Sequence, residues 1–235
     1  MPIKSENRNP PFNITRLSHV VLSSKDLDKT RYFYETGLGL EVTFQDKNNL
    51  YLRCLEESWN HSLIFQKHEG PACCFKIGYR VFDEDDLNKA KDFFDQKEIP
   101  CKFSKRQFQG NTIELDDIVG VPLEFCATMD QKEPLMRRFD QHTGGRCAFL
   151  DHIQISTHDV QSAFDWYSDL GFRLTEYTAA DGTDELWGVW LKRKYNTQDV
   201  VYSNGEGPML HHIAPVSLYT SPSPRDQRGS GMPCY

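Results

Sequence analysis

The stretch Asp151-His-Ile-Gln-Ile-Ser-Thr-His-Asp-Val160 decides the fold, because Ser18-His-Val-Val-Leu-Ser-Ser-Lys-Asp-Leu27 repeats its pattern. His152 follows His19 at a separation of 133 residues. In both stretches a short apolar run leads into an acidic residue and a helix-like pattern, which is typical of a strand followed by a capped helix. The chain is therefore a tandem duplication.

Each copy also contains a weaker internal repeat of the same strand–helix pattern. In the first copy, the strand-like run Phe75-Lys-Ile-Gly-Tyr-Arg-Val81 precedes acidic residues 83–86. Leu87, Ala90 and Phe94 then follow at helical spacing. The repeating unit is thus a strand, a helix and several strands, used twice per module, which predicts an α+β fold.

The expected boundaries follow from these units. We expect a disordered lead-in over 1–14, a first module over 15–128, a polar linker over 129–146, and the first part of a second module over 147–214. The first module should contain strands at 17–22, 50–54, 62–66, 75–82, 112–116 and 122–126 and helices at 26–36 and 84–96. The helix of the second module should open after Thr157 or Asp159 and stop at Gly171.

The second module is expected to be incomplete. Taking Tyr79 as the counterpart of His212, the first module continues for 45 residues to Glu124, whereas 23 residues follow His212. Prolines at 215, 222, 224 and 233 argue against a helix or a central strand there. We therefore expect a truncated chain whose residues 215–235 are an aberrant, non-native and disordered tail; a genuine Ser/Pro-rich disordered tail is the alternative.

Composition sets limits on the class of protein. The net charge of −7, without a basic stripe, argues against a nucleic-acid partner. No apolar run of about 18 residues or more is present and residues 1–16 are polar, so neither a membrane span nor a signal peptide is predicted, and a cytoplasmic location is expected. The seven cysteines form no C-x-x-C pair and fit reduced thiols.

His152 and His212 are the candidate metal ligands. Each opens a strand-like run at a corresponding place in the repeat, so that His152 and Gln154 should share one face. Two neutral imidazoles and one carboxylate make the facial triad that binds Fe(II) and leaves positions open for a catechol and O2. By the repeat, the carboxylate is expected near position 257, beyond the last residue of this chain.

A structural interpretation stands beside this one, because strand histidines are more often packing residues than ligands. In the first module His19 and Glu124 hold corresponding positions while Tyr79 replaces the second histidine, so that site is interpreted as vestigial. His211 should face away from the site. No role is assigned to the remaining histidines: His61, His68, His142 and His158.

The motifs Leu150-Asp-His-Ile, Trp187-Gly-Val-Trp-Leu-Lys-Arg-Lys and Gly205-Glu-Gly-Pro-Met-Leu-His-His-Ile-Ala resemble the type I extradiol dioxygenases of the vicinal-oxygen-chelate (glyoxalase/bleomycin-resistance) superfamily, in particular homoprotocatechuate 2,3-dioxygenases. The helix segment with Trp166-Tyr and Leu170-Gly-Phe is also similar. The likeness covers residues 17–214. It implies tandem βαβββ modules, with non-haem Fe(II), or alternatively Mn(II), in the C-terminal one.

The resemblance also implies site roles and a reaction. His152 and His212 match the metal histidines, and Trp190 and Gln154 match substrate-pocket positions. Gln198 stands where these enzymes carry an acid/base histidine, and glutamine cannot shuttle a proton. The implied activity is meta cleavage of a catecholic ring with O2, by a homo-oligomer when full length. Lacking the third ligand, this chain is expected to bind Fe(II) poorly, to be inactive and to aggregate.

Two other functions remain open from the sequence. One is a glyoxalase-like metal isomerase or thiol transferase, although such sites usually take a further carboxylate from the first module. The other is a non-catalytic aromatic-binding module, which Gln198 would suit. The metal content separates the three: iron favours the dioxygenase, zinc or nickel the isomerase, and no metal the binding module.

Overall fold

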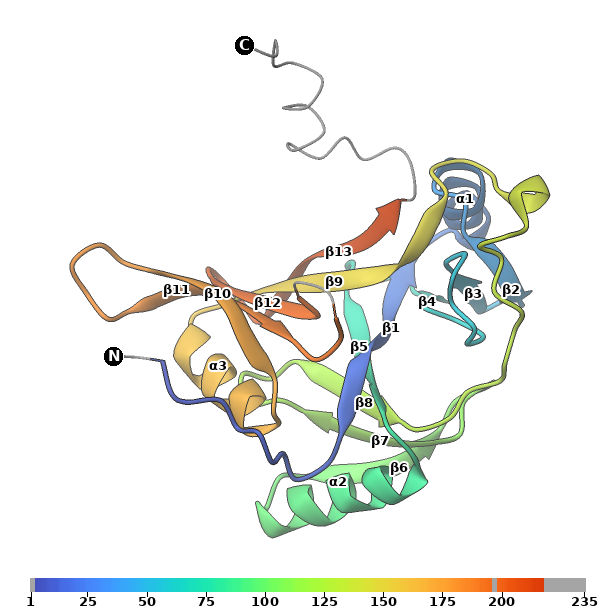
Figure 1. Cartoon of the computed structure of the whole chain (residues 1–235). Coiled ribbons are helices and arrows are strands. Elements are labelled where there is room, and N and C mark those ends of the chain that lie inside the picture. Colours follow the sequence, from blue (N-terminus) through green and yellow to red (C-terminus); the bar gives the residue numbers. More distant parts are fainter. Residues whose placement is uncertain (1–2, 196–197, 218–235) are drawn as a thin grey trace, which may run out of the picture.

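Two mixed β-sheets with helices on their outer faces form the molecule (Figure 1), as seen in a computed structural model that describes residues 3–195 and 198–217. The eight-stranded sheet of the first module has the order β2-β3-β4-β1-β5-β8-β7-β6, and the five-stranded sheet of the second module has the order β10-β11-β12-β9-β13. Each module therefore has a sheet of its own.

The strands of the first sheet are β1 Ile14–Ser24, β2 Glu41–Gln45, β3 Asn49–Arg53, β4 Leu63–Lys67, β5 Cys74–Val81, β6 Cys101–Lys105, β7 Asn111–Asp116 and β8 Pro122–Cys126. Those of the second are β9 Cys147–Thr157, β10 Arg173–Ala179, β11 Leu186–Lys192, β12 Val200–Asn204 and β13 Met209–Ser217. The helices are α1 Leu27–Arg31, which continues as the π-helix Tyr32–Gly37, then α2 Glu84–Gln96, the 3-10 turn Phe139–Gln141 and α3 Val160–Asp169.

The strand pairing confirms the predicted α+β fold and its tandem duplication. In the first module β1 runs parallel to β4 and antiparallel to β5. In the second, β9 runs parallel to β12 and antiparallel to β13. Strand β13 thus takes the place of β5, and the described part of the second module corresponds to the first half of the first module plus one strand.

Aspartate side chains start the helices, as the sequence predicts. Asp83 accepts a hydrogen bond from the backbone N–H of Asp86 at 2.8 Å, and Asp159 accepts one from Ser162 at 2.8 Å. Each satisfies one of the free N–H groups of a first helical turn. Gly171, with φ +81°, follows α3 in the left-handed conformation that glycine adopts without strain.

Two strands of the first module, β2 and β6, were not predicted. They lie at the two ends of the first sheet, and none of their residues is buried. Since an edge strand with little burial lacks an alternating apolar pattern, periodicity cannot detect it.

The expected disordered lead-in needs correction for residues 3–13. Phe12 is buried, and its ring lies 5.6 Å from that of Phe94 and 5.8 Å from that of Phe125. Lys4 Nζ lies 2.6 Å from Asp169 Oδ1 at the end of α3. The buried Phe12 ring holds the segment against the first module, and the Lys4–Asp169 ion pair holds it against the second. The sequence did not predict these contacts because the other residues of the segment are mostly polar.

The expected start of an aberrant tail at residue 215 also needs correction. Pro215 lies opposite Leu150, and Val216 opposite Phe149, within β13. A proline is tolerated here because β13 is the last strand of its sheet among the described residues, and an edge strand needs no N–H donor on its outer side. The rest of the expected tail, 218–235, lies outside the described residues.

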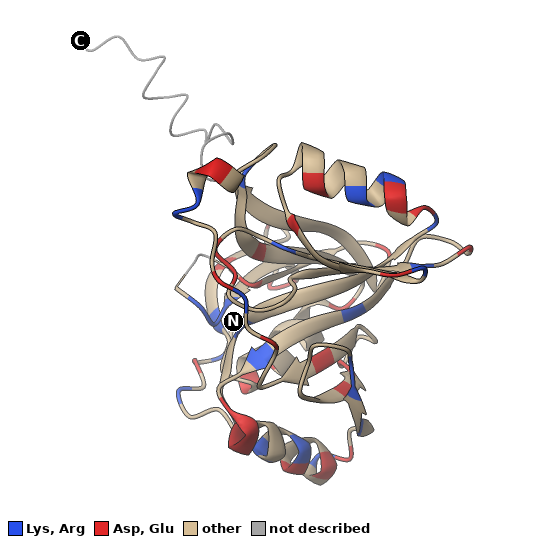
Figure 2. Cartoon of the chain, turned by 90° about the vertical axis from the view of Figure 1, so that its right-hand side faces the viewer, with Lys and Arg blue, Asp and Glu red and all other residues tan. Residues whose placement is uncertain are grey.

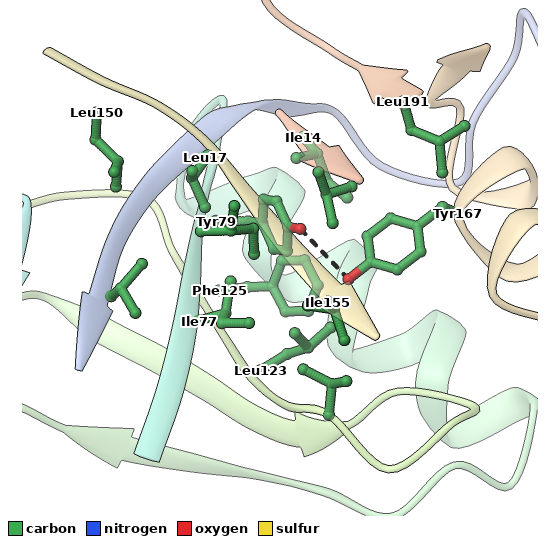
Figure 3. Close-up of a cluster of buried hydrophobic side chains, with 14 of the residues drawn as sticks. Ile14, Leu17, Ile77, Tyr79, Leu123, Phe125, Leu150, Ile155, Tyr167 and Leu191 are labelled. Carbon is green, nitrogen blue, oxygen red and sulfur yellow. Dashed lines mark hydrogen bonds between the residues drawn. The ribbon is translucent and has the colours of Figure 1, made fainter. Parts of the chain in front are cut away.

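A single core joins the two modules. Residues of β1, β5 and β8 pack with residues of β9 and α3 in one hydrophobic cluster (Figure 3). Within it the Tyr79 hydroxyl donates a hydrogen bond to the Tyr167 hydroxyl at 3.3 Å. The modules therefore share their apolar interior, and the linker over 129–146 joins parts that already pack together.

Two hydrogen bonds from backbone N–H groups to side-chain carboxylates connect the modules reciprocally. Leu17 N–H in β1 donates to Asp199 Oδ1 at 2.7 Å, and Leu150 N–H in β9 donates to Glu57 Oε1 at 3.4 Å. Leu17 and Leu150 are equivalent in the repeat, so each module supplies an acid to the first strand of the other. Asp199 also pairs with Lys194, 3.2 Å away, and both side chains are buried.

The charged side chains of both signs are interspersed along the helices and loops (Figure 2). Helix α2 illustrates this, because Lys89 pairs with Asp85 at 2.6 Å one turn away. Across residues 3–195 and 198–217, no helix has the length and apolar character needed to cross a membrane.

Candidate metal centre

The structure brings His152 and His212 together. His152 lies in β9 opposite Ala214, and His212 lies in β13 opposite Gln154, so the two histidines stand on the same face of neighbouring strands. Their ring centroids are 5.6 Å apart with an interplanar angle of 77°. Two imidazoles in this arrangement fit a shared cation at the usual nitrogen–metal distance of about 2.0–2.1 Å after small side-chain rotations.

Neighbouring groups hold the Nδ1 atoms of both rings. His152 Nδ1 lies 2.7 Å from Asp151 Oδ2, and His212 Nδ1 lies 2.8 Å from His211 Nδ1. A histidine that binds metal through Nε2 commonly donates its other N–H to a carboxylate, as the contact of His152 with Asp151 allows. Burial, with the nearby charges of His152 and His211, lowers the pKa of His212, which favours the neutral ring that a metal requires.

The pocket residues implied by the resemblance lie on the same face as His212. Gln154 stands opposite Val201 of β12, and Val201 stands opposite Trp190 of β11. The Gln154 amide donates to Ser203 Oγ at 3.0 Å, which fixes its orientation. The face therefore carries two imidazoles at one side and an indole two strands beyond Gln154, an arrangement suited to a flat aromatic molecule.

Gln198 lies beside His152. Its Nε2 is 3.4 Å from both His152 Nδ1 and His152 Nε2, and it directly precedes the buried Asp199. The side-chain amide can donate a hydrogen bond into the site but has no ionisable proton at neutral pH. The site thus has a polar donor at this place and no acid/base group.

The described residues provide only part of the ligands that a metal ion needs. In residues 3–195 and 198–217 no group of three His, Cys, Asp or Glu side chains is arranged to hold a metal ion. The two imidazoles could provide two ligands of a metal site, because their rings lie close together and the Nδ1 atom of each is already in contact with a neighbouring side chain. An apolar cavity of about 440 Å³, lined by residues such as Phe65, Ile77 and Met209, lies elsewhere between the modules and contains none of the predicted site residues.

The strand register corrects one correspondence of the repeat. His19 lies opposite Gly78 as His152 lies opposite Ala214, so Val21 opposite Lys76 matches Gln154 opposite His212. Lys76, and not Tyr79, is therefore the counterpart of His212. Tyr79 is fully buried in the core on the other face of the sheet. An alignment of Phe75-Lys-Ile-Gly78 with His211-His-Ile-Ala214 gives the same correspondence from the sequence. In it Ile77 matches Ile213, and the small residue Gly78 matches Ala214.

The same register gives His61 a counterpart that the sequence reading missed. Val20 pairs with Leu63 as Ile153 pairs with Val200, so His61 corresponds to Gln198. His61 lies beside His19, with ring centroids 5.0 Å apart. Each module thus places a hydrogen-bonding side chain next to the histidine of its first strand.

In the first module an arginine accompanies the corresponding histidine and acid. His19 Nε2 lies 2.5 Å from Glu124 Oε1, and Arg106 Nη2 lies 2.8 Å from Glu124 Oε2. Burial alone would raise the pKa of Glu124, but the charges and hydrogen bonds of His19 and Arg106 outweigh it and hold that pKa well below its usual range.

Gly78 is required beside His19, and its replacement by alanine should destabilise the protein. A Cβ at this position would stand 2.2 Å from His19 Cε1, inside a fully buried pair. We expect Gly78→Ala to lower the free energy of unfolding by about 1–3 kcal/mol, as overpacking does. Urea unfolding measures it. Gly37→Ala is the control, because its Cβ meets nothing within 4 Å; equal losses in both variants would contradict the steric explanation.

Comparison with known proteins agrees with the fold described above. Residues 149–218 match the family model described as Glyoxalase/Bleomycin resistance protein/Dioxygenase superfamily. The metapyrocatechase of Geobacillus stearothermophilus is 24% identical over 234 residues, covering 90% of this chain and 70% of the relative. A manganese-dependent 2,3-dihydroxybiphenyl 1,2-dioxygenase of Geobacillus genomosp. 3 is 21% identical over 216 residues, covering 86% of this chain and 68% of the relative.

Solved structures give a higher identity. The homoprotocatechuate 2,3-dioxygenase of Brevibacterium fuscum, in an anaerobic complex with 3,4-dihydroxyphenylacetate, matches with a TM-score of 0.82 and 31% identity, covering 89% of this chain and 66% of that one. The enzyme of Arthrobacter globiformis matches with a TM-score of 0.81 and 30% identity, covering 88% of this chain and 65% of that one. The present chain thus spans just under two thirds of these solved enzymes.

The duplicated fold matches the vicinal-oxygen-chelate fold, and residues 149–218 match the model of that superfamily. Within that superfamily it is similar to extradiol ring-cleaving dioxygenases, and these solved relatives are homoprotocatechuate 2,3-dioxygenases.

Proposed function

We propose that this chain carries the two-histidine part of the metal site of an extradiol dioxygenase, which cleaves a catecholic ring with O2 at non-haem Fe(II), or alternatively Mn(II). The observation that carries the proposal is the facing pair of His152 and His212 rings, 5.6 Å apart on equivalent strands. The similarity to metapyrocatechase and to homoprotocatechuate 2,3-dioxygenases supports the reaction class.

Each residue of the face has a distinct task in this proposal. His152 and His212 bind the cation through Nε2, while Asp151 orients the first ring through Nδ1. Trp190 stacks on the aromatic ring, and Gln154 offers a hydrogen-bonding amide between the indole and the imidazoles. The bound cation supplies charge to polarise catechol oxygens and redox capacity toward O2.

Gln198 sets the expected rate of turnover. Its amide stands 3.4 Å from the His152 ring, so it can donate a hydrogen bond toward a ligand beside that ring. Proton transfer must then go through water or through the substrate itself, since an amide has no usable pKa near neutrality. Positioned acid/base groups typically contribute about 10²–10⁴-fold to a rate, so we expect turnover to be slow unless another group takes the role.

The third ligand is proposed to be a carboxylate equivalent to Glu124. Lys76 and Glu124 are separated by 48 residues, so the same spacing after His212 places the equivalent near position 260 in a longer protein rather than near 257. In the first module Glu124 lies opposite Gly78 on β8, a parallel neighbour of β5. A strand added beside β13 in the same register would bring a carboxylate opposite Ala214 and next to His152.

The proposal is tested with two proteins, the 235-residue chain and a fusion extended by the C-terminal part of the Brevibacterium fuscum enzyme. Both are loaded anaerobically with Fe(II) or Mn(II), desalted, analysed for metal and assayed for O2 uptake with 3,4-dihydroxyphenylacetate. The fusion should retain metal and consume O2 only with the catechol, whereas the chain alone should do neither well. Equal metal content and O2 uptake would contradict the proposed third ligand. Retention of zinc or nickel instead of iron would favour the isomerase, and binding of aromatics without any metal the binding module.

Asp151→Asn should weaken metal binding by about 10- to 100-fold, because an amide oxygen orients the His152 ring without the carboxylate charge. Competition with a chelator measures the affinity in the fusion. Asp184→Asn, an exposed change of the same kind in the loop between β10 and β11, is the control. A similar loss in both variants would assign the effect to overall charge instead of ring orientation.

A further inference from the structure

The first module contains a buried polar cluster, called here the His19 cluster, made of His19, His61, Arg106, Gln109 and Glu124. The side chains of His19 and Glu124 are fully buried, His61 is 1% exposed, and the Arg106 side chain is 15% exposed. His19 and His61 occupy the positions that His152 and Gln198 hold in the second module. The cluster is therefore the first-module counterpart of the candidate metal centre.

Hydrogen bonds link four of its groups in a chain that is centred on Glu124. Glu124 Oε1 lies 2.5 Å from His19 Nε2 and 3.1 Å from Gln109 Nε2. Gln109 Oε1 in turn lies 3.2 Å from His61 Nε2. The His19 and His61 rings, with centroids 5.0 Å apart, are at least as close as those of His152 and His212. Two imidazoles and one carboxylate thus lie in one hydrogen-bonded cluster, with Glu124 at its centre and Gln109 between Glu124 and His61.

Arg106 supplies the positive charge at that centre. Its Nε lies 3.2 Å from Glu124 Oε1 and its Nη2 lies 2.8 Å from Glu124 Oε2, so both carboxylate oxygens face the guanidinium. A buried carboxylate needs a cationic partner, and arginine is a permanent one. Because Arg106 is also the most exposed of these charged side chains, it closes the cluster toward solvent.

We propose that the guanidinium of Arg106 takes the place of a divalent cation in the first module, and that His19, His61 and Glu124 form a metal site that this arginine keeps closed. Two imidazole nitrogens and one carboxylate oxygen suit Zn²⁺, Co²⁺ or Fe²⁺. Entry of the cation breaks the hydrogen bond between His19 and Glu124, and the proton of that bond passes to water. Among the described residues no three such side chains are arranged to hold a metal ion as they stand, so opening of the site must rearrange them.

Removal of Arg106 tests the proposal. All proteins carry His152→Ala, which eliminates the second-module pair, so the result does not depend on the proposed dioxygenase function. Arg106→Ala in this background should bind about one Co²⁺ per chain, seen by visible absorption bands, and its unfolding temperature should rise with Co²⁺. Adding Glu124→Gln should weaken that Co²⁺ binding by about 10- to 100-fold or more.

The controls separate an opened site from a general loss of positive charge. His152→Ala alone, and His152→Ala with Lys105→Ala at an exposed neighbouring position, should bind no Co²⁺ at this stoichiometry. Arg106→Gln is a second variant that removes the guanidinium but keeps more side-chain volume than alanine. A variant that folds only when Co²⁺ is present also supports the proposal. Absence of Co²⁺ binding in both Arg106 variants, or binding that Glu124→Gln and His61→Ala leave unchanged, would overturn it.

Discussion

Asp199→Ala should lower the free energy of unfolding by about 3–5 kcal/mol, the range found when one partner of a buried ion pair is removed. The substitution leaves the buried Lys194 ammonium without its carboxylate, which lies 3.2 Å away in the native protein. It also removes the acceptor of the Leu17 N–H at 2.7 Å and of the Arg193 N–H at 2.7 Å. Because Leu17 belongs to the other module, one side chain supports both the loop before β12 and the contact between modules. Chemical denaturation followed by tryptophan fluorescence measures the loss.

Asp140→Ala is the matched control, because the Asp140 side chain is 71% exposed and 3.7 Å from Arg138. A surface ion pair of this kind contributes about 0–1 kcal/mol. The double variant Asp199→Ala with Lys194→Met separates the buried charge from the lost backbone acceptor. It should recover part of the stability, since no unpaired ammonium remains. A loss in Asp199→Ala no larger than that of Asp140→Ala would show that the buried pair is unimportant.

His152→Ala should reduce the metal affinity of the extended fusion at least about 100-fold, beyond the 10- to 100-fold typical of an outer partner. The change removes one of two imidazoles, and the remaining His212 ring cannot hold the cation with comparable geometry. Catechol-dependent O2 uptake should fall to background in parallel. Metal analysis after dialysis and oxygen-electrode assays measure the two effects.

His158→Ala is the control for this variant, because His158 is exposed just before α3 and belongs to the same repeat stretch. It should leave metal content and O2 uptake unchanged. Thermal unfolding of both variants without metal separates ligand loss from misfolding, since the half-buried His152 contributes little to the core. Metal content that survives His152→Ala and His212→Ala alike would contradict the assigned pair.

The helix starts and the duplication could be predicted because they depend on local rules. Asp83 and Asp159 cap their helices through backbone N–H groups three residues away, and such short-range geometry is visible as spacing. His152 and His212 were likewise found because each opens an apolar strand-like run in the sequence, although both lie inside their strands, β9 and β13. The edge strands β2 and β6 were not predicted because neither has a buried face, and their sequences therefore lack an alternating apolar pattern.

The sequence by itself determined the repeat, the fold class and the two histidines that the fold brings face to face, since apolar periodicity and residue type record which face is buried. Tertiary structure decided the partner positions through the strand register, because loop lengths differ between the copies and a fixed sequence offset does not follow them. It replaced Tyr79 by Lys76 as the counterpart of His212 and revealed His61 as that of Gln198. It also decided the contacts of Asp199 with Leu17 and of Arg106 with Glu124, which join residues too far apart in the chain for any local pattern to encode.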